Sequence, residues 1–212
     1  MDSLETTGGH TLDSLEALAR VYDAPLERIV AKEIDHIDAL GRAFIARSPF
    51  LLLATAGAAG VDCSPKGDAP GFVQVPDDRT LLIPDRPGNN RIDGMKNIVE
   101  NPQVGILFLV PGANETFRVN GRARIGVDPA LLNRFLVDGK PPRSVIVVTV
   151  DQAFNHCPKA FVRSRLWAAG AEGRPEGVPT TGRFAAARDG RDDAYAAAYD
   201  ADYAVRMPKS LY

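Results

Sequence analysis

The 212-residue chain has few cysteines and histidines, no long apolar run and almost no net charge. Its two cysteines, Cys63 and Cys157, lie far apart in the sequence. They fit reduced thiols in a cytoplasmic protein better than a disulfide framework. Its three histidines, His10, His36 and His156, are scattered. Because no zinc-ligand spacing exists among these residues, we expect no metal site.

Further absences exclude several classes of protein. No apolar segment approaches the length of a membrane-spanning helix, and the first residues lack the basic start and apolar block of a secretory signal. A net charge of −2 gives no reason to expect a nucleic-acid-binding surface. No glycine-rich dinucleotide fingerprint follows a strand, and the sequence contains neither a phosphate-binding P-loop nor a G-x-S-x-G serine elbow. We therefore expect a cytoplasmic protein that uses neither a metal nor a serine triad.

The sequence does contain a series of short apolar segments separated by turn residues. Residues predicted to form strands are 50–55, 61–64, 72–75, 81–83, 104–110, 116–125 and 144–150. Short turns join most of them, with few helices between. This spacing favours an antiparallel barrel or sandwich of about six strands over a doubly wound parallel sheet.

Helical patterns and composition divide the chain into three expected parts. Helices are predicted around residues 12–19, 32–47, 91–99 and 128–136. From Ala168 to Asp193 the composition shifts to Gly, Pro, Ala and charged residues, which predicts an irregular arm with a weakly helical piece near Ala194–Ala198. We therefore expect an N-terminal helical extension (1–31), a β domain (32–167) and a C-terminal arm (168–212).

The stretch from Leu81 to Val110 combines a strand, a polar loop, a helix start and a second strand. Asn90, with Asp93 three residues later, predicts an N-cap with a capping-box-like start. Apolar residues at positions 92, 95 and 99 predict the inward face of the helix. The free amides of the helix start, its dipole and Arg91 would form an anion site. The alternative is a capped helix with a solvated Arg91.

Residues 81–125 resemble the pyridoxamine 5′-phosphate oxidase-like, FMN-binding split-barrel superfamily. Their sequence is LLIPDRPGNNRIDGMKNIVENPQVGILFLVPGANETFRVNGRARI. SPFLLLATAGAAGVDCSPKGDAPGFV adds the preceding hairpin of that fold, and HCPKAFVRSRLW is similar to its last barrel segment. The likeness covers roughly residues 40–167. It implies a mainly β fold, a six-stranded antiparallel split barrel with flanking helices. It also implies a homodimer that holds one FMN per protomer at the dimer interface.

The resemblance further implies which residues contact the cofactor. On the strand after the first hairpin and in the loop before the helix these are Ser64, Lys66, Gly67, Asp85, Asn89, Asn90 and Arg91. On the long strand and after the last strand they are Thr116, Arg118, Lys159 and Arg163. Arg91 becomes the main phosphate ligand, because Ile92 stands where the family leads us to expect a second basic residue. For Lys66 the alternative is a solvated turn lysine, and for Lys159 and Arg163 it is an exposed basic helix face.

The implied activity is that of an FMN-dependent oxidoreductase acting on a small molecule, with no identifiable catalytic residue. Pyridoxamine phosphate oxidases grip their substrate through a C-terminal Arg-x-His, and no histidine follows His156 in this sequence. We therefore expect FMN binding without oxidation of pyridoxamine phosphate. The alternatives are a non-enzymatic flavin, haem or deazaflavin carrier on the same barrel, or a structural dimer with an empty cleft. For haem, the candidate axial ligands are His36 and His156.

Overall fold

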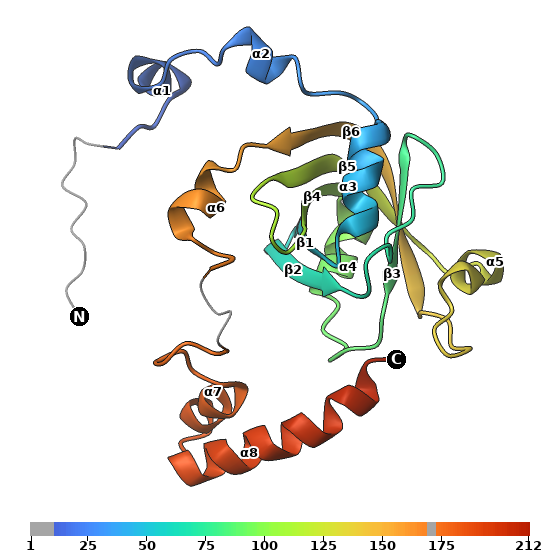
Figure 1. Ribbon diagram of the computed structural model, residues 1–212, viewed down its shortest axis with the longest axis vertical. Helices are drawn as coiled ribbons and strands as arrows, with labels where there is room; N and C mark the ends of the chain where they lie inside the picture. The colour runs from blue at the N-terminus through green and yellow to red at the C-terminus, as the bar shows by residue number, and fades with distance from the viewer. Residues whose placement is uncertain (1–10, 169–172) are drawn as a thin grey trace. The chain divides into compact units, whose positions relative to one another are not determined.

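The computed structural model of the protein describes residues 11–168 and 173–212 (Figure 1). Residues 1–33 and 34–212 form two separate compact units. The described part of the first unit contains α1 (Leu15–Val21) and α2 (Glu27–Val30), neither of which buries a residue. Ser14 caps α1 by accepting a hydrogen bond from the Ala17 amide, so the first predicted helix is confirmed. Residues 1–10 of the expected extension lie outside the described residues.

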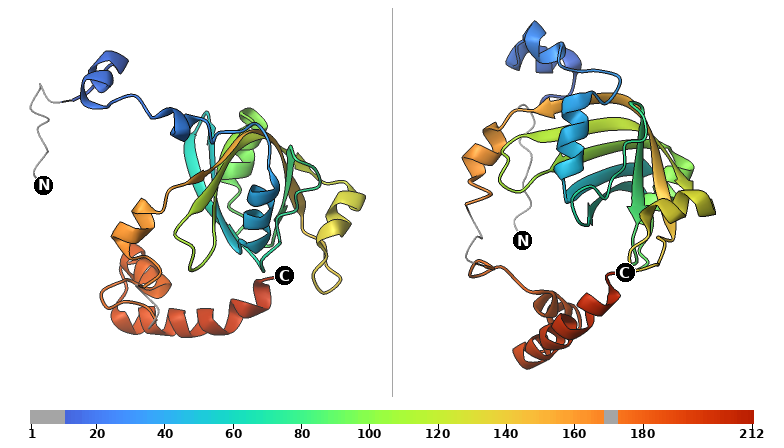
Figure 2. Two further views of the ribbon diagram at one scale, coloured as in Figure 1. Left: turned by 45° about the horizontal axis from the view of Figure 1, so that its top comes forward. Right: turned by 45° about the vertical axis from the view of Figure 1, so that its right-hand side comes forward.

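The second unit is built on one six-stranded antiparallel sheet with the order β2-β1-β4-β5-β6-β3. The strands are β1 (Phe50–Gly57), β2 (Gly60–Gly67), β3 (Thr80–Asp85), β4 (Gln103–Leu109), β5 (Thr116–Gly126) and β6 (Ser144–His156). The sheet curls into a half-barrel flanked by helices (Figures 1 and 2), which confirms the predicted split-barrel fold.

Alternating burial along the strands places the core inside the curl. In β1 and β4 every second residue is buried, including Leu51, Leu53, Ile106 and Phe108. β6 departs from this alternation, because residues 144–148 are buried without a break. Its second face packs in a smaller cluster around Phe135, which ends the segment formed by α5 (Pro129–Leu132) and η1 (Asn133–Phe135).

Three predicted strand boundaries are wrong. Residues 72–75 form only one isolated bridge, between Gln74 and Leu82, and are not part of the ladder of the sheet. β2 continues through Pro65, where a break was predicted. β2 is an edge strand, in which a missing N–H need not remove a ladder bond. The last barrel segment is β6, and the residues predicted for that role form α6 (Lys159–Ser164) instead.

The helix predicted over residues 32–47 begins later, as α3 (Ala39–Arg47), with Asp38 as its N-cap. Ile34, predicted to be helical, instead pairs with Ala153 of β6. α3 lies against the curved sheet (Figures 1 and 2), and a Cβ added at Gly41 would overlap the ring of Phe117. This position therefore has room only for glycine.

The helix predicted around residues 91–99 is α4 (Asp93–Glu100), but its inward face differs from the prediction. Val99 is 79% exposed, whereas Ile98 and Asn97 are buried. Asn97 is accommodated because its side-chain amide donates a hydrogen bond to Thr55 Oγ1 at 3.1 Å. A pattern of apolar residues cannot reveal an inward face that includes a buried amide.

The C-terminal arm contains more helix than its composition predicts. α7 (Thr181–Arg188) and α8 (Asp193–Arg206) pack against each other, and η2 (Pro208–Ser210) follows. The Gly182 amide donates to Asp200 Oδ1 at 2.7 Å, and the backbone carbonyl of Ala196 lies where a Cβ at Gly182 would be. Small residues thus allow the close approach of these two helices.

Candidate functional site

A cavity of about 430 Å³ opens between β2, the end of β3, the following loop and the start of α4. Its apolar side includes the buried residues Leu53, Phe72 and Ile146. Seven of the eleven predicted cofactor residues line it: Ser64, Lys66, Gly67, Asp85, Asn89, Asn90 and Arg91. The fold therefore brings together two segments that the sequence separates by about twenty residues.

Lys66 and Asp85 connect the two edge strands of the sheet across the cavity. Lys66 on β2 donates from Nζ to Asp85 Oδ1 on β3 at 2.9 Å, and both side chains are about one-fifth exposed. β2 and β3 are at opposite ends of the strand order, so this ion pair spans the split in the barrel. Lys66 is consequently ion-paired and mostly buried, and it is not a solvated turn lysine.

The first turn of α4 packs directly on β2. Ser64 Oγ donates to Asp62 Oδ2 at 2.6 Å, and a Cβ added at Gly94 would lie 3.0 Å from that same carboxylate oxygen. A side chain at position 94 would therefore meet the Asp62 carboxylate at close contact distance. Glycine at this position allows the close approach of the helix start to Asp62.

The predicted N-cap of α4 is wrong. Ile92 occupies the cap position, and no side chain caps the first turn, whose residues 93–95 line the cavity. Asn90 instead has a positive φ of 60°, and its Oδ1 accepts a hydrogen bond from Arg143 Nη1 at 2.6 Å. Asn89 Oδ1 accepts from the Arg91 amide at 2.9 Å. The asparagines thus shape the loop and leave the helix amides available to a ligand.

Arg91 lies at the rim of the cavity, with its side chain 80% exposed. Its Nε donates to Asp93 Oδ2 at 2.6 Å. This hydrogen bond raises the pKa of Arg91 and lowers the pKa of Asp93. An anionic ligand would therefore compete with Asp93 for this guanidinium.

Two of the cationic residues that line the cavity were not among the predicted cofactor residues. Arg86 follows β3, and Arg143 immediately precedes β6. Arg86 was overlooked within a run of turn residues. Arg143 lies 52 positions beyond Arg91 and carries no local signal; the pairing of β3 with β6 brings it to the site.

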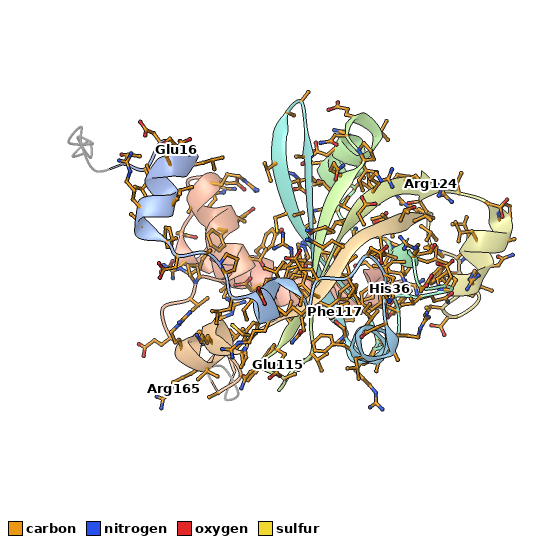
Figure 3. All side chains as sticks on the ribbon, turned by 90° about the horizontal axis from the view of Figure 1, so that it is seen from above. Glu16, His36, Glu115, Phe117, Arg124 and Arg165 are labelled. Carbon is orange, nitrogen blue, oxygen red and sulfur yellow. The ribbon has the colours of Figure 1, made fainter. Side chains whose placement is uncertain are left out.

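The other four predicted cofactor residues do not line this cavity. Thr116 is buried and faces His156 across the β5–β6 ladder, and the Arg118 guanidinium lies 5.6 Å from the centre of the Phe154 ring. Lys159 and Arg163 are four residues apart on α6 and are exposed. This end of the domain appears in Figure 3 around Glu115 and Arg165.

Within residues 11–168 and 173–212, no three or more His, Cys, Asp or Glu side chains are grouped to hold a metal ion. In the same described ranges, no helix is both long and apolar enough to cross a bilayer.

Comparisons with solved structures give resemblances at low identity. HupZ of Group A Streptococcus is 21% identical, with 56% of this chain and 93% of HupZ covered and a TM-score of 0.46. A predicted pyridoxamine 5′-phosphate oxidase of Lactobacillus delbrueckii is 18% identical, with coverages of 57% and 95% and a TM-score of 0.46. An FMN-binding protein of Syntrophomonas wolfei is 14% identical, with coverages of 55% and 83% and a TM-score of 0.44.

No curated protein matches the chain. The family model described as pyridoxamine 5′-phosphate oxidase, in contrast, matches residues 37–157. This range contains every strand of the barrel, α4 and the whole lining of the cavity. Because the match spans more than half of the sequence, the chain belongs to the pyridoxamine 5′-phosphate oxidase family.

Proposed function

We propose that the protein is an FMN-binding flavoprotein and an oxidoreductase that acts on a small molecule other than pyridoxamine phosphate. The observation that carries this proposal is the cavity at the split of the barrel. It combines an apolar side, several cations and an uncapped helix start in one space. Its volume of about 430 Å³ lies within the range of small-molecule and cofactor sites.

The chemistry of the lining fits the phosphate of FMN. The first-turn amides of α4 lack a side-chain cap, and a helix start of this kind favours a bound anion. Arg91 in the loop before α4, and Arg143 before β6, which is hydrogen-bonded to Asn90 of that loop, add two guanidinium groups. The amides, Arg91 and Arg143 would hold the phosphate, with Arg91 giving up part of its bond to Asp93.

The rest of the lining fits the flavin ring. Leu53, Phe72 and Ile146 would bury part of the ring, while Lys66, oriented by Asp85, would supply a positive charge. When bound, FMN supplies the hydride and electron transfer itself. The residues of this chain would orient it, exclude water from its apolar face and balance its charge.

A homodimer with the cofactor at its interface would account for three of the four remaining predicted contacts. Thr116, Arg118, Lys159 and Arg163 lie outside the chain's own cavity. In the proposed dimer, the exposed Arg118, Lys159 and Arg163 of one protomer approach the cavity of the other, whereas Thr116 is buried within its own protomer. Each site would then need both copies of the chain.

The cavity supports a flavin better than a haem with histidine ligation. His36 is hydrogen-bonded to Asp35 at 3.0 Å, His156 ends β6, and neither lines the cavity. A deazaflavin in place of FMN remains the alternative cofactor, and a non-enzymatic carrier the alternative role.

The visible absorption spectrum of the purified protein tests the cofactor. We expect a flavin spectrum, release of FMN on denaturation, and a dimer with one FMN per chain by light scattering. A Soret band would indicate haem, and a deazaflavin spectrum the alternative coenzyme. A stable monomer that retains stoichiometric FMN would refute the shared site, and a protein that binds no flavin after incubation with FMN would refute the proposed function.

A further inference from the structure

Asp68, in the loop after β2, forms the centre of a hydrogen-bond network beside the cavity. Its side chain is only 5% exposed. It accepts hydrogen bonds from the Ala69 amide at 2.7 Å, from Arg86 Nε at 2.8 Å and from the Tyr212 hydroxyl at 2.6 Å. Burial raises the pKa of Asp68, but these hydrogen bonds outweigh that effect and lower it. Asp68 is therefore an ionised carboxylate at neutral pH.

Tyr212 connects the segment after α8 to this network. Its hydroxyl donates to Asp68, and the Arg86 guanidinium lies 5.6 Å from the centre of its ring. Lys140 Nζ donates to the Tyr212 backbone oxygen at 3.3 Å. The hydrogen bond to Asp68 raises the pKa of Tyr212, which keeps its hydroxyl protonated. Both views in Figure 2 place the C-terminus near the β3 end of the sheet, in agreement with these contacts.

Arg86 is the member of the network that reaches the cavity. Its Nη1 donates to the Phe135 carbonyl at 2.7 Å, and its side chain is 16% exposed. A guanidinium carries five N–H donors, and these two bonds engage only Nε and one hydrogen of Nη1. The described residues contain no fully buried side-chain nitrogen without a partner, so the rest of the guanidinium reaches open space. Arg86 also lines the cavity, which makes these free N–H groups candidate donors to a ligand there.

We propose that Arg86 donates a hydrogen bond to an oxygen of the bound flavin and that Tyr212, acting through Asp68, is the residue that positions it. The segment after α8 is thereby part of the binding site. This inference rests on the proposed function, because the ligand is the flavin assigned to the cavity.

The geometry separates this role from simple anchoring of the arm. An anchor requires only that Tyr212 hold its own segment against the domain. Here the tyrosine hydroxyl and Arg86 Nε bind the same carboxylate, while the tyrosine ring contacts the same guanidinium. Removing the hydroxyl would leave Asp68 with fewer partners and Arg86 with greater freedom, so the two residues should act on the ligand as a coupled pair.

The test is a double-mutant cycle in which the FMN affinity of each variant is measured from the change in flavin fluorescence on binding. We expect Arg86→Gln to weaken FMN binding about tenfold, the value of a hydrogen bond from a charged donor. Tyr212→Phe, which keeps the ring, should weaken it about threefold alone but leave it unchanged in the Arg86→Gln background. Tyr203→Phe is the matched control on the same arm and should have no effect.

Thermal unfolding of each variant checks that the fold persists. If the Arg86→Gln protein does not fold, because the buried carboxylate of Asp68 has lost its charged partner, the cycle is run with Arg86→Lys instead. That variant retains the positive charge and loses the planar fork of the guanidinium. Two results would overturn this inference and leave the proposed function standing. One is an equal loss of FMN affinity from Tyr212→Phe in both backgrounds, and the other is an unchanged FMN affinity in the Arg86 variant. Failure of the unaltered protein to bind FMN would refute the proposed function, and this inference with it.

Discussion

Replacement of Arg91 tests the phosphate end of the cavity most directly. Arg91→Ala removes one of the two guanidinium groups beside the uncapped start of α4 and leaves the apolar side of the cavity intact. A charge-assisted hydrogen bond is worth a factor of about 10–100 in affinity. Arg91 is 80% exposed and already bound to Asp93 at 2.6 Å, so part of that factor is spent in breaking the existing bond. We therefore expect FMN affinity to fall by roughly five- to thirtyfold.

Riboflavin, which lacks the phosphate, provides the internal comparison for this variant. Its affinity should change much less than that of FMN, with both measured by flavin fluorescence titration. Arg122→Ala is the matched control, because Arg122 also forms an exposed ion pair, at 3.1 Å to Asp151, but does not line the cavity. Equal losses for FMN and riboflavin, or a similar loss in the control, would show that Arg91 does not bind the phosphate.

Three other expectations concern packing, pH and substrate. Gly41→Ala should destabilise the protein by about 1–3 kcal/mol through overpacking and lower its Tm by about 2–12 °C. Gly88→Ala is the control and should leave the Tm unchanged, because the space around Gly88 is open. Equal effects of the two substitutions on the Tm would contradict the packing described. The pKa of Asp35 is lowered to about 2 by its hydrogen bonds with His36 and Arg79. Its contribution to the stability of the fold is therefore present at pH values above the ordinary aspartate pKa of 3.8 and is lost as the pH falls through about 2. Carboxyl NMR should show this midpoint and its rise in Arg79→Gln; an unshifted midpoint in the unaltered protein would refute the assignment. Finally, flavin-loaded protein should oxidise pyridoxamine 5′-phosphate far more slowly than about 1 per second, the lower end of ordinary enzyme turnover, and aldehyde formation in air at that rate or faster would restore the vitamin B6 activity.

The charge arrangement of the cavity has a common physical basis. Lys66, Arg86 and Arg91 are each bound to a carboxylate, and Arg143 is bound to the amide oxygen of Asn90. Such partners orient long side chains before a ligand arrives, which reduces the conformational entropy lost on binding. They also compete with the ligand. Charge-removing substitutions should accordingly have smaller effects on affinity than an isolated cation would predict.

The strand pattern is largely determined by local sequence. Alternating or continuous apolar residues bounded by turn formers predict β1, β3, β4, β5 and β6, because burial on the face of a sheet acts residue by residue. Caps at Ser14 and Asp128 mark helix starts for the same local reason. The loop before α4 could likewise be identified as a candidate site, since its turn residues, Arg91 and the following helix lie next to one another in the chain.

Only the tertiary structure determines which distant residues complete that site. Arg143 reaches the cavity because β3 pairs with β6, and Lys66 reaches Asp85 because the curled sheet brings its two edges together. Asn97 is buried because Thr55 of a neighbouring strand accepts its hydrogen bond. Tyr212 meets Asp68 across 144 positions of sequence. In each case, the energy that places the side chain comes from a partner distant in the chain, so no local pattern of residue types could reveal it.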